Sequence, residues 1–323
     1  MRLWRKNSTL NTRKRGASEG ARMNWHILVV LRILIGGILG QILLKQLSSA
    51  PSRTRNIVWQ YLFTGALAFI AAAVTQSFVF SWQVAIVAGF GVLSAFAGYC
   101  HWRAVDISLS KSALFGPGGD VWAMFLGFVF LHESKHLNPL LWVGLVLALG
   151  AVILFFVSKA KQARQDDKIR VVNKKERWVW IGLAIGVMIW GTSAFLTRYL
   201  VVEIMSPWTF MMAWYGGSVI GSFAVFALAG KKEAGEPLGR RQILWIFPRS
   251  AVMWISFVLS GWTLKYAPIT VVQPIFVVSG IVLSTILGLW VFKEVKQLST
   301  LEKIATAIGV IGGVVIALSF RQN

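Results

Sequence analysis

The feature that most constrains this chain is the run from Ile57 to Trp102, which contains no Asp, Glu, Lys or Arg. A soluble domain would have to keep this whole run out of water, and it is too long for a single helix to cross about 30 Å of hydrocarbon. Polar residues between Gln76 and Gln83 indicate a turn near its middle. The run therefore predicts two membrane-spanning helices, at 57–77 and 82–103.

The rest of the chain repeats this pattern. Apolar residues make up 56% of the chain and charged residues 14%, with a mean hydropathy of +0.65, so the chain needs lipid as its solvent. Cutting at charges, prolines and polar clusters gives about ten apolar segments of helix-spanning length. The other eight are 25–47, 109–131, 139–157, 178–200, 207–229, 243–265, 269–292 and 302–320. We expect an all-α polytopic membrane protein of about ten transmembrane helices.

Basic residues lie mainly outside these segments. The chain has 33 Lys and Arg against 12 Asp and Glu, a formal charge of +21. A soluble protein with this charge would be a candidate for nucleic-acid binding. Here the charge lies in a tail, 1–24, and in short loops that include the connector 158–177, as expected if basic residues hold cytoplasmic segments against anionic lipid. The expected partner is therefore the lipid bilayer and not nucleic acid.

The two halves of the chain share a pattern. WRAVDIS at Trp102–Ser108 and WTLKYAP at Trp262–Pro268 each end a segment before an apolar run, and each run is followed by E-x-K-x-L, in HESKHL and KEVKQL. Five helices in each half is an odd number, so the second half must enter the membrane from the opposite side. We therefore expect two inverted five-helix repeats, at 25–157 and 178–320.

These residues resemble the drug/metabolite transporter superfamily, specifically its ten-helix family of paired EamA domains. The segment from Trp178 to Leu200 is similar to the family's first helix, with Trp190-Gly191 followed by small residues and then a basic one. Ser206-Pro207 opens the next helix as in that family, whereas the first half has Gly36-Gly37 where Trp-Gly would be. The resemblance implies a secondary transporter that moves amino acids, nucleobases, sugars or other metabolites by exchange or proton coupling, often as export, through a central cavity lined by both repeats.

Asp120 is the most informative single residue, because it falls near the middle of the segment 109–131. A carboxylate at the centre of a membrane helix costs about 2.5–3.5 kcal/mol, so it should face a wet cavity or a partner. We expect it to bind a proton or a cationic group of the substrate; the alternative is an ion pair between helices with no transport role. Gly116-Pro117-Gly118-Gly119 just before it should interrupt the helix, as broken helices do at transporter sites.

Three further residues are candidates for the substrate site. Arg32, inside the first segment, could pair with Asp120, extend to the membrane surface or bind an anionic substrate. Trp190 could stack on a solute or serve only in packing, and Gln273, before the kink-forming Pro274, could hydrogen-bond it. Trp214, Tyr215 and Trp254 are weaker aromatic candidates. Arg249, near the start of a helix, has the same three possibilities as Arg32, with extension to the membrane surface favoured.

The segment His132-Glu133-Ser134-Lys135-His136 matches H-E-x-x-H, which on a helix would bind zinc for a metalloprotease. The aligned Lys293-Glu294-Val295-Lys296-Gln297 of the second half keeps the glutamate but not the histidines, so the match is weak. A membrane-embedded zinc protease and a lipid-linked sugar flippase remain the alternatives. We expect a non-enzymatic transporter in the inner, or cytoplasmic, membrane, with no metal or cofactor, that takes a small-molecule substrate and protons.

Overall fold

The computed structural model of the chain describes residues 25–48, 52–113, 115–132, 139–165, 167–234, 237–293 and 299–319, and every regular element in these ranges is a helix. The elements of the first half are α1 (Trp25–Arg32), η1 (Ile33–Leu39), α2 (Gly40–Ser48), α3 (Arg53–Val74), α4 (Trp82–Ile107), α5 (Leu109–Ala113), α6 (Gly116–Leu131) and α7 (Pro139–Gln165). Those of the second half are α8 (Asp167–Glu203), α9 (Pro207–Ala234), α10 (Arg240–Tyr266), α11 (Ile269–Ile286), η3 (Leu287–Val291) and α12 (Thr300–Ser319).

The chain is a multi-pass helical membrane protein. Six helical stretches in the described residues are long and apolar enough to cross a bilayer: Trp25–Ser48, Arg53–Val74, Trp82–Ile107, Arg177–Val202, Pro207–Ala229 and Arg240–Tyr266. Large apolar side chains such as Phe80, Leu228 and Trp290 are exposed on the outside, while many serine and threonine side chains are buried. This pattern suits a protein surrounded by hydrocarbon, where helices must satisfy their own backbone hydrogen bonds.

The helices begin and end close to where hydropathy places them. The polar turn predicted between Gln76 and Gln83 is confirmed, because α3 ends at Val74 and α4 begins at Trp82. Ser81 caps α4 by accepting a hydrogen bond from the Val84 amide at 3.4 Å, and Ser206 caps α9 through the Thr209 amide at 3.1 Å. The polar connector 158–177 is helical over most of its length, as the end of α7 and the start of α8.

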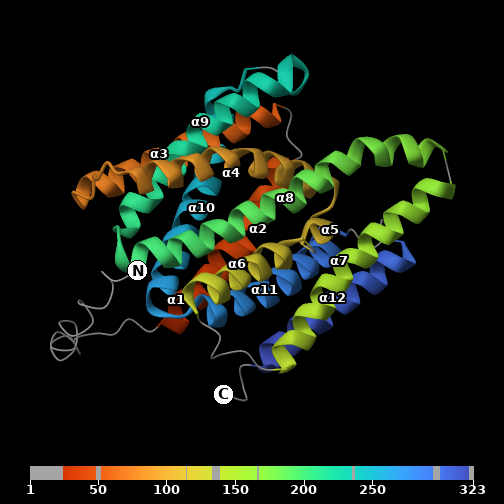
Figure 1. Cartoon of the computed structure of the whole chain (residues 1–323). Helices are drawn as coiled ribbons and strands as arrows, with labels where there is room; N and C mark the ends of the chain where they lie inside the picture. Colours follow the sequence, from red (N-terminus) through yellow and green to blue (C-terminus); the bar gives the residue numbers. More distant parts are fainter. Residues whose placement is uncertain are drawn as a thin grey trace.

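Close packing of small residues joins the two halves. A Cβ atom placed on Gly91 of α4 would overlap the Trp214 carbonyl oxygen of α9, and one on Gly217 of α9 would overlap the Ala88 carbonyl oxygen of α4. Small residues allow helix backbones to approach closely in lipid. The helices of the two halves therefore form one bundle, in which α7 and α12 lie side by side at one edge (Figure 1).

Several of these helices are interrupted. The segment 109–131 is divided into α5 and α6, with Pro117 in the first turn of α6. The first helix contains the π-helical element η1, which includes Gly36 and Gly37, while Pro248 and Pro274 lie inside α10 and α11. π-Helical turns and internal prolines disturb the regular hydrogen-bond ladder and often occur at functional sites.

Candidate functional site

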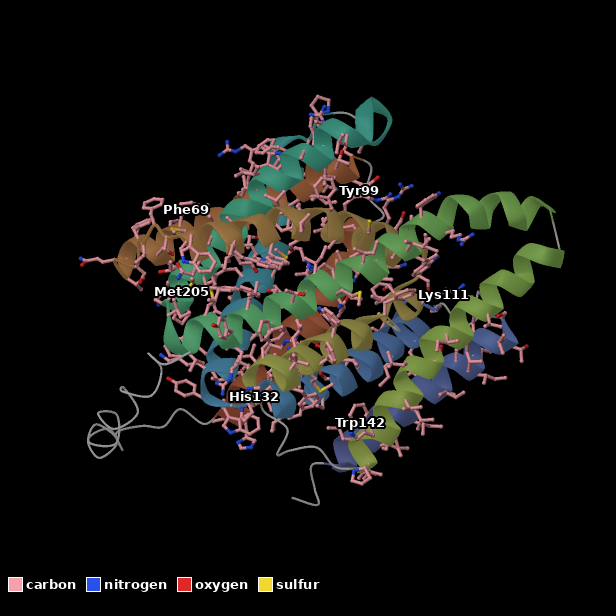
Figure 2. All side chains as sticks on the ribbon, viewed as in Figure 1. Phe69, Tyr99, Lys111, His132, Trp142 and Met205 are labelled. Atoms are coloured by element: carbon pink, nitrogen blue, oxygen red, sulfur yellow. The ribbon has the colours of Figure 1, made fainter. Side chains whose placement is uncertain are left out.

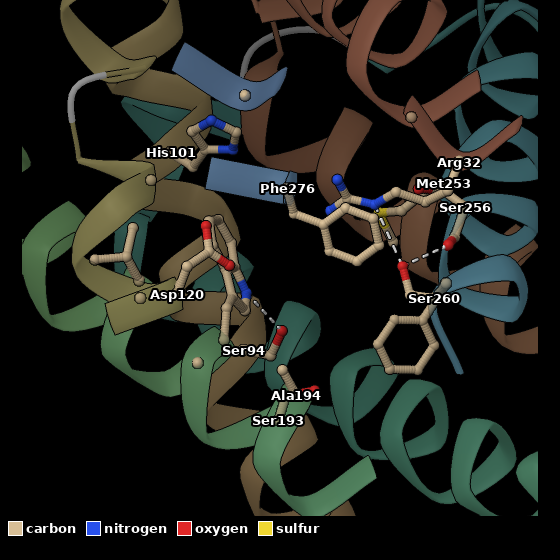
Figure 3. Close-up of a pocket in the computed structure, with 18 of the residues that line it drawn as sticks. Arg32, Ser94, His101, Asp120, Ser193, Ala194, Met253, Ser256, Ser260 and Phe276 are labelled. Atoms are coloured by element: carbon tan, nitrogen blue, oxygen red, sulfur yellow. Dashed lines mark hydrogen bonds between the residues drawn. The ribbon is translucent and has the colours of Figure 1, made fainter. Parts of the chain in front are cut away.

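A cavity of about 400 Å³ lies inside the bundle, with walls from both halves of the chain. This volume falls in the range of small-molecule binding sites. All four residues predicted for the substrate site line it: Arg32, Asp120, Trp190 and Gln273. They come from α1, α6, α8 and α11, so the fold brings together residues that are far apart in sequence. Figure 3 labels Arg32 and Asp120 among the lining residues.

Asp120 lies in the second turn of α6. Close packing of α6 on α8 fixes its position, because a Cβ atom on Gly119 would overlap the Val187 carbonyl oxygen and one on Gly191 would overlap the Gly119 carbonyl oxygen. Neither a hydrogen bond nor an ion pair joins the Asp120 carboxylate to the residues that the structure describes. The carboxylate is therefore available to a ligand or a proton in the cavity.

Arg32 lies at the cavity wall and does not extend to the membrane surface. Its Nε donates a hydrogen bond to Ser260 Oγ at 3.3 Å, and its guanidinium carbon lies 3.8 Å from the centroid of the Phe276 ring. Figure 3 shows Arg32 and Asp120 on different walls. The ion pair that the sequence allowed between them is not formed, since the described salt bridges join other residues.

Trp190 and Gln273 contribute a ring and an amide to the wall. Trp190 Nε1 donates to Ser94 Oγ at 3.2 Å, and the indole meets the His101 imidazole edge to face, with ring centroids 5.2 Å apart. Gln273 is 3% exposed and precedes Pro274 in α11. The hydrogen bond and the ring contact hold the Trp190 indole in a fixed orientation beside the cavity.

Arg249 is the main residue for which the favoured sequence-based expectation, extension to the membrane surface, is wrong. Its side chain lines the cavity instead of extending to the surface, and one terminal guanidinium nitrogen donates to the Gly40 carbonyl oxygen at 3.0 Å. The cause is the close approach of α10 to α2, where a Cβ atom on Gly40 would lie 3.0 Å from this nitrogen. The adjacent Pro248 is the sequence signal, because it parallels the Gln273-Pro274 pair.

The remaining candidates divide between cavity and core. Trp214 and Tyr215 line the cavity, as do His101, Gln41 and Tyr61, which sequence reasoning did not select. Trp254 is not part of the wall and stacks against Trp208, with centroids 6.3 Å apart. In Figure 2, Lys111 lies toward one end of the bundle and His132 toward the other.

His132 follows the last residue of α6 and has a left-handed backbone, with φ of 54°. The predicted zinc motif needs its first histidine inside a helix, so His132 does not have the required conformation. Glu133 to His136 lie outside the described residues. Among the residues that the structure describes, no three His, Cys, Asp or Glu side chains come together as potential metal ligands.

Comparison with known proteins bears on the fold. No family model matches the sequence, and no curated protein matches it. The chain is similar to the crystal structure of a protein with which it shares 15% sequence identity, over 94% of this chain and 99% of that one, at a TM-score of 0.62. At this identity, the likeness shows that the fold is shared over nearly the whole chain.

Proposed function

We propose that this chain is a secondary transporter that moves small metabolites, such as amino acids or related solutes, across the inner membrane of a cell. The observation that carries the proposal is the unpaired Asp120 carboxylate in a cavity inside a membrane-spanning bundle. Ionisable groups at such positions are costly and are typically retained for substrate or proton binding. The wall needs no catalytic group for this work, because transport requires binding and a change of access only.

The helix contacts support ten crossings in two inverted repeats, as in paired EamA domains of drug/metabolite transporters. Each helix of one half can be exchanged with the helix at the same position in the other half. After this exchange, pairs of helices that are in contact become other pairs that are also in contact. The pair α4–α8 maps onto α10–α1, α4–α9 onto α10–α3, and α6–α8 onto α11–η1. The pairs α3–α9, α6–α11 and α7–α12 each map onto themselves, as expected for a pseudo-twofold axis in the membrane plane.

Solute counterflow in proteoliposomes tests the proposal. The purified protein is reconstituted, loaded with unlabelled solutes from a metabolite panel, and assayed for uptake of the labelled solute. We expect exchange by the wild type and at least a tenfold loss in Asp120→Asn. Asp106→Asn is the matched control, because Asp106 pairs with Arg53 outside the cavity. Absence of exchange for every solute, from protein shown to be folded, would contradict transport.

A lipid-linked amphiphile is a second candidate substrate, favoured by a specific observation. An apolar groove of about 450 Å³ lies between α6, α7 and α8, and Val187 lines both this groove and the central cavity. A polar head group in the cavity and a chain in the groove would match the two environments. A labelled polyprenyl-phosphate sugar is placed in proteoliposomes, and its accessibility to an impermeant reductant is measured. This assay distinguishes flipping of the lipid from exchange of a soluble solute.

A further inference from the structure

The charges on the cavity wall do not balance. In the described part of the chain, the wall carries the Arg32 and Arg249 guanidinium groups and a single carboxylate, Asp120. A guanidinium group stays protonated in proteins. Charged groups away from bulk water are unfavourable without a partner, so the cavity favours a ligand that brings net negative charge.

Neither arginine forms an ion pair with a residue that the structure describes. The hydrogen bonds that the structure gives to Arg32 and Arg249 go to neutral oxygens, Ser260 Oγ and the Gly40 carbonyl. Each guanidinium has five N–H donors, and these contacts occupy only part of them. Arg249 Nε is buried without a hydrogen-bond partner, so this donor lacks the partner that buried polar groups normally have.

An unsatisfied acceptor lies on the same wall. Gln41 Oε1 is also buried without a hydrogen-bond partner, and Gln41 lines the cavity together with Arg249. The hydroxyl of Tyr61, a further wall residue, donates to the Ser94 carbonyl oxygen at 3.3 Å. The wall therefore offers positive charge, one negative charge and free groups of both hydrogen-bonding types.

We propose that the cavity binds a small organic acid with net negative charge, and that amino dicarboxylates are the class that fits best. Their two carboxylates and one ammonium group complement the two guanidinium groups and one carboxylate of the wall. The carboxylates bind Arg249 and Arg32, and the ammonium group binds Asp120. This inference rests on the proposed transport function for its biological meaning, although binding itself can be measured without transport.

The test is equilibrium binding to the full-length protein in detergent. Glutamate is the probe. Its binding is measured by thermal stabilisation of the protein and by the change in intrinsic tryptophan fluorescence, since Trp190 and Trp214 line the cavity. Comparison ligands are succinate, which lacks the amine, leucine, which has one carboxylate, and lysine, which carries an additional positive charge. We expect glutamate to bind most tightly, succinate and leucine more weakly, and lysine weakest.

Variants then test which charged residue of the wall binds which group of the ligand. Arg249→Gln should weaken glutamate binding by about tenfold or more, because hydrogen bonds to charged groups are among the strongest. Arg249→Lys keeps the positive charge and should lose less of the affinity for glutamate. Asp120→Asn should weaken the binding of glutamate but not that of succinate, because succinate has no ammonium group that Asp120 would bind. The ligand ranking on the wild type needs no variant, so misfolding of Arg249→Gln would leave the proposal testable.

The outcomes separate this inference from the transport function. Tighter binding of lysine than of glutamate, or no binding of any organic anion at millimolar concentration, would overturn it even if counterflow of another solute occurs. Glutamate binding that is sensitive to Arg249, without counterflow, would support the site and count against transport.

Discussion

At the scale of single residues, the cavity is built from charges that have few protein partners. Asp120 has no hydrogen bond or ion pair to the described residues, and Arg32 rests on Phe276 and Ser260. By contrast, Lys111 of α5 and Glu302 of α12 form a buried pair, with Nζ and Oε1 3.1 Å apart and side chains 9% and 2% exposed. The two arrangements predict opposite effects on stability when a charge is removed.

Asp120→Asn should leave the protein as stable as the wild type or make it more stable. The substitution removes a buried charge without breaking a hydrogen bond or an ion pair, because the carboxylate forms neither with the described residues. Thermal unfolding in detergent measures the change, and Asp120→Glu, which keeps the charge, is the control. A clear drop in the unfolding temperature of Asp120→Asn would point to a structural ion pair instead.

Lys111→Met should destabilise the protein by about 3–5 kcal/mol, because it leaves the Glu302 carboxylate buried without its cation. Glu302 also accepts a hydrogen bond from the Ser299 amide at 2.8 Å, and glutamine can replace it there. The double variant Lys111→Met with Glu302→Gln should therefore recover much of the loss. Denaturant unfolding in mixed micelles measures the interaction energy between Lys111 and Glu302. If the double variant loses the sum of the two single losses in stability, the two side chains do not interact.

At the scale of helices, glycines determine how closely the two halves approach. Gly91 and Gly89 lie two residues apart in α4, so they face different surroundings. A Cβ atom on Gly91 would overlap the Trp214 carbonyl oxygen, whereas one on Gly89 has no neighbouring atom within 4 Å. The pair provides a matched experiment on one helix.

Gly91→Ala should destabilise the protein by about 1–3 kcal/mol, the usual cost of overpacking. Gly89→Ala should be neutral or stabilising by up to about 1 kcal/mol, because alanine favours a helix more than glycine does. The midpoint of thermal unfolding compares the two variants. Equal effects at both positions would show that the contact between α4 and α9 does not limit stability.

At the scale of the whole molecule, hydropathy predicts where helices lie because lipid leaves few alternatives to a helix. The turn near Gln76 and the interruption before Asp120 are both readable from local sequence. Arg249 is not, because its placement depends on the packing of α10 against Gly40. The candidate site was thus predictable at Asp120, the one acidic residue of its apolar segment, and missed at Arg249, whose side chain is turned inward by tertiary packing.

The arrangement also predicts which loops share a side of the membrane. Gln76, after α3, and Ile204, after α8, should lie on one side, and Gly239, before α10, on the other, because α9 separates Ile204 from Gly239. Single cysteines at these exposed positions, in a Cys100→Ala background, can be labelled with an impermeant maleimide in oriented vesicles. Labelling of all three from the same side would contradict a membrane-crossing α9.

The π-helical element η1 has a consequence for the angular phase of the first helix. Arg32 precedes η1 and Gln41 follows it, yet both line one cavity. A π-helical turn holds one residue more than an α-helical turn, so the return of η1 to a regular α-helix with no residue removed would rotate everything before it by about 100° relative to Gln41. Arg32 would then face away from the cavity while the apolar length of the helix hardly changed. The element η1 therefore sets which side of the first helix faces the cavity.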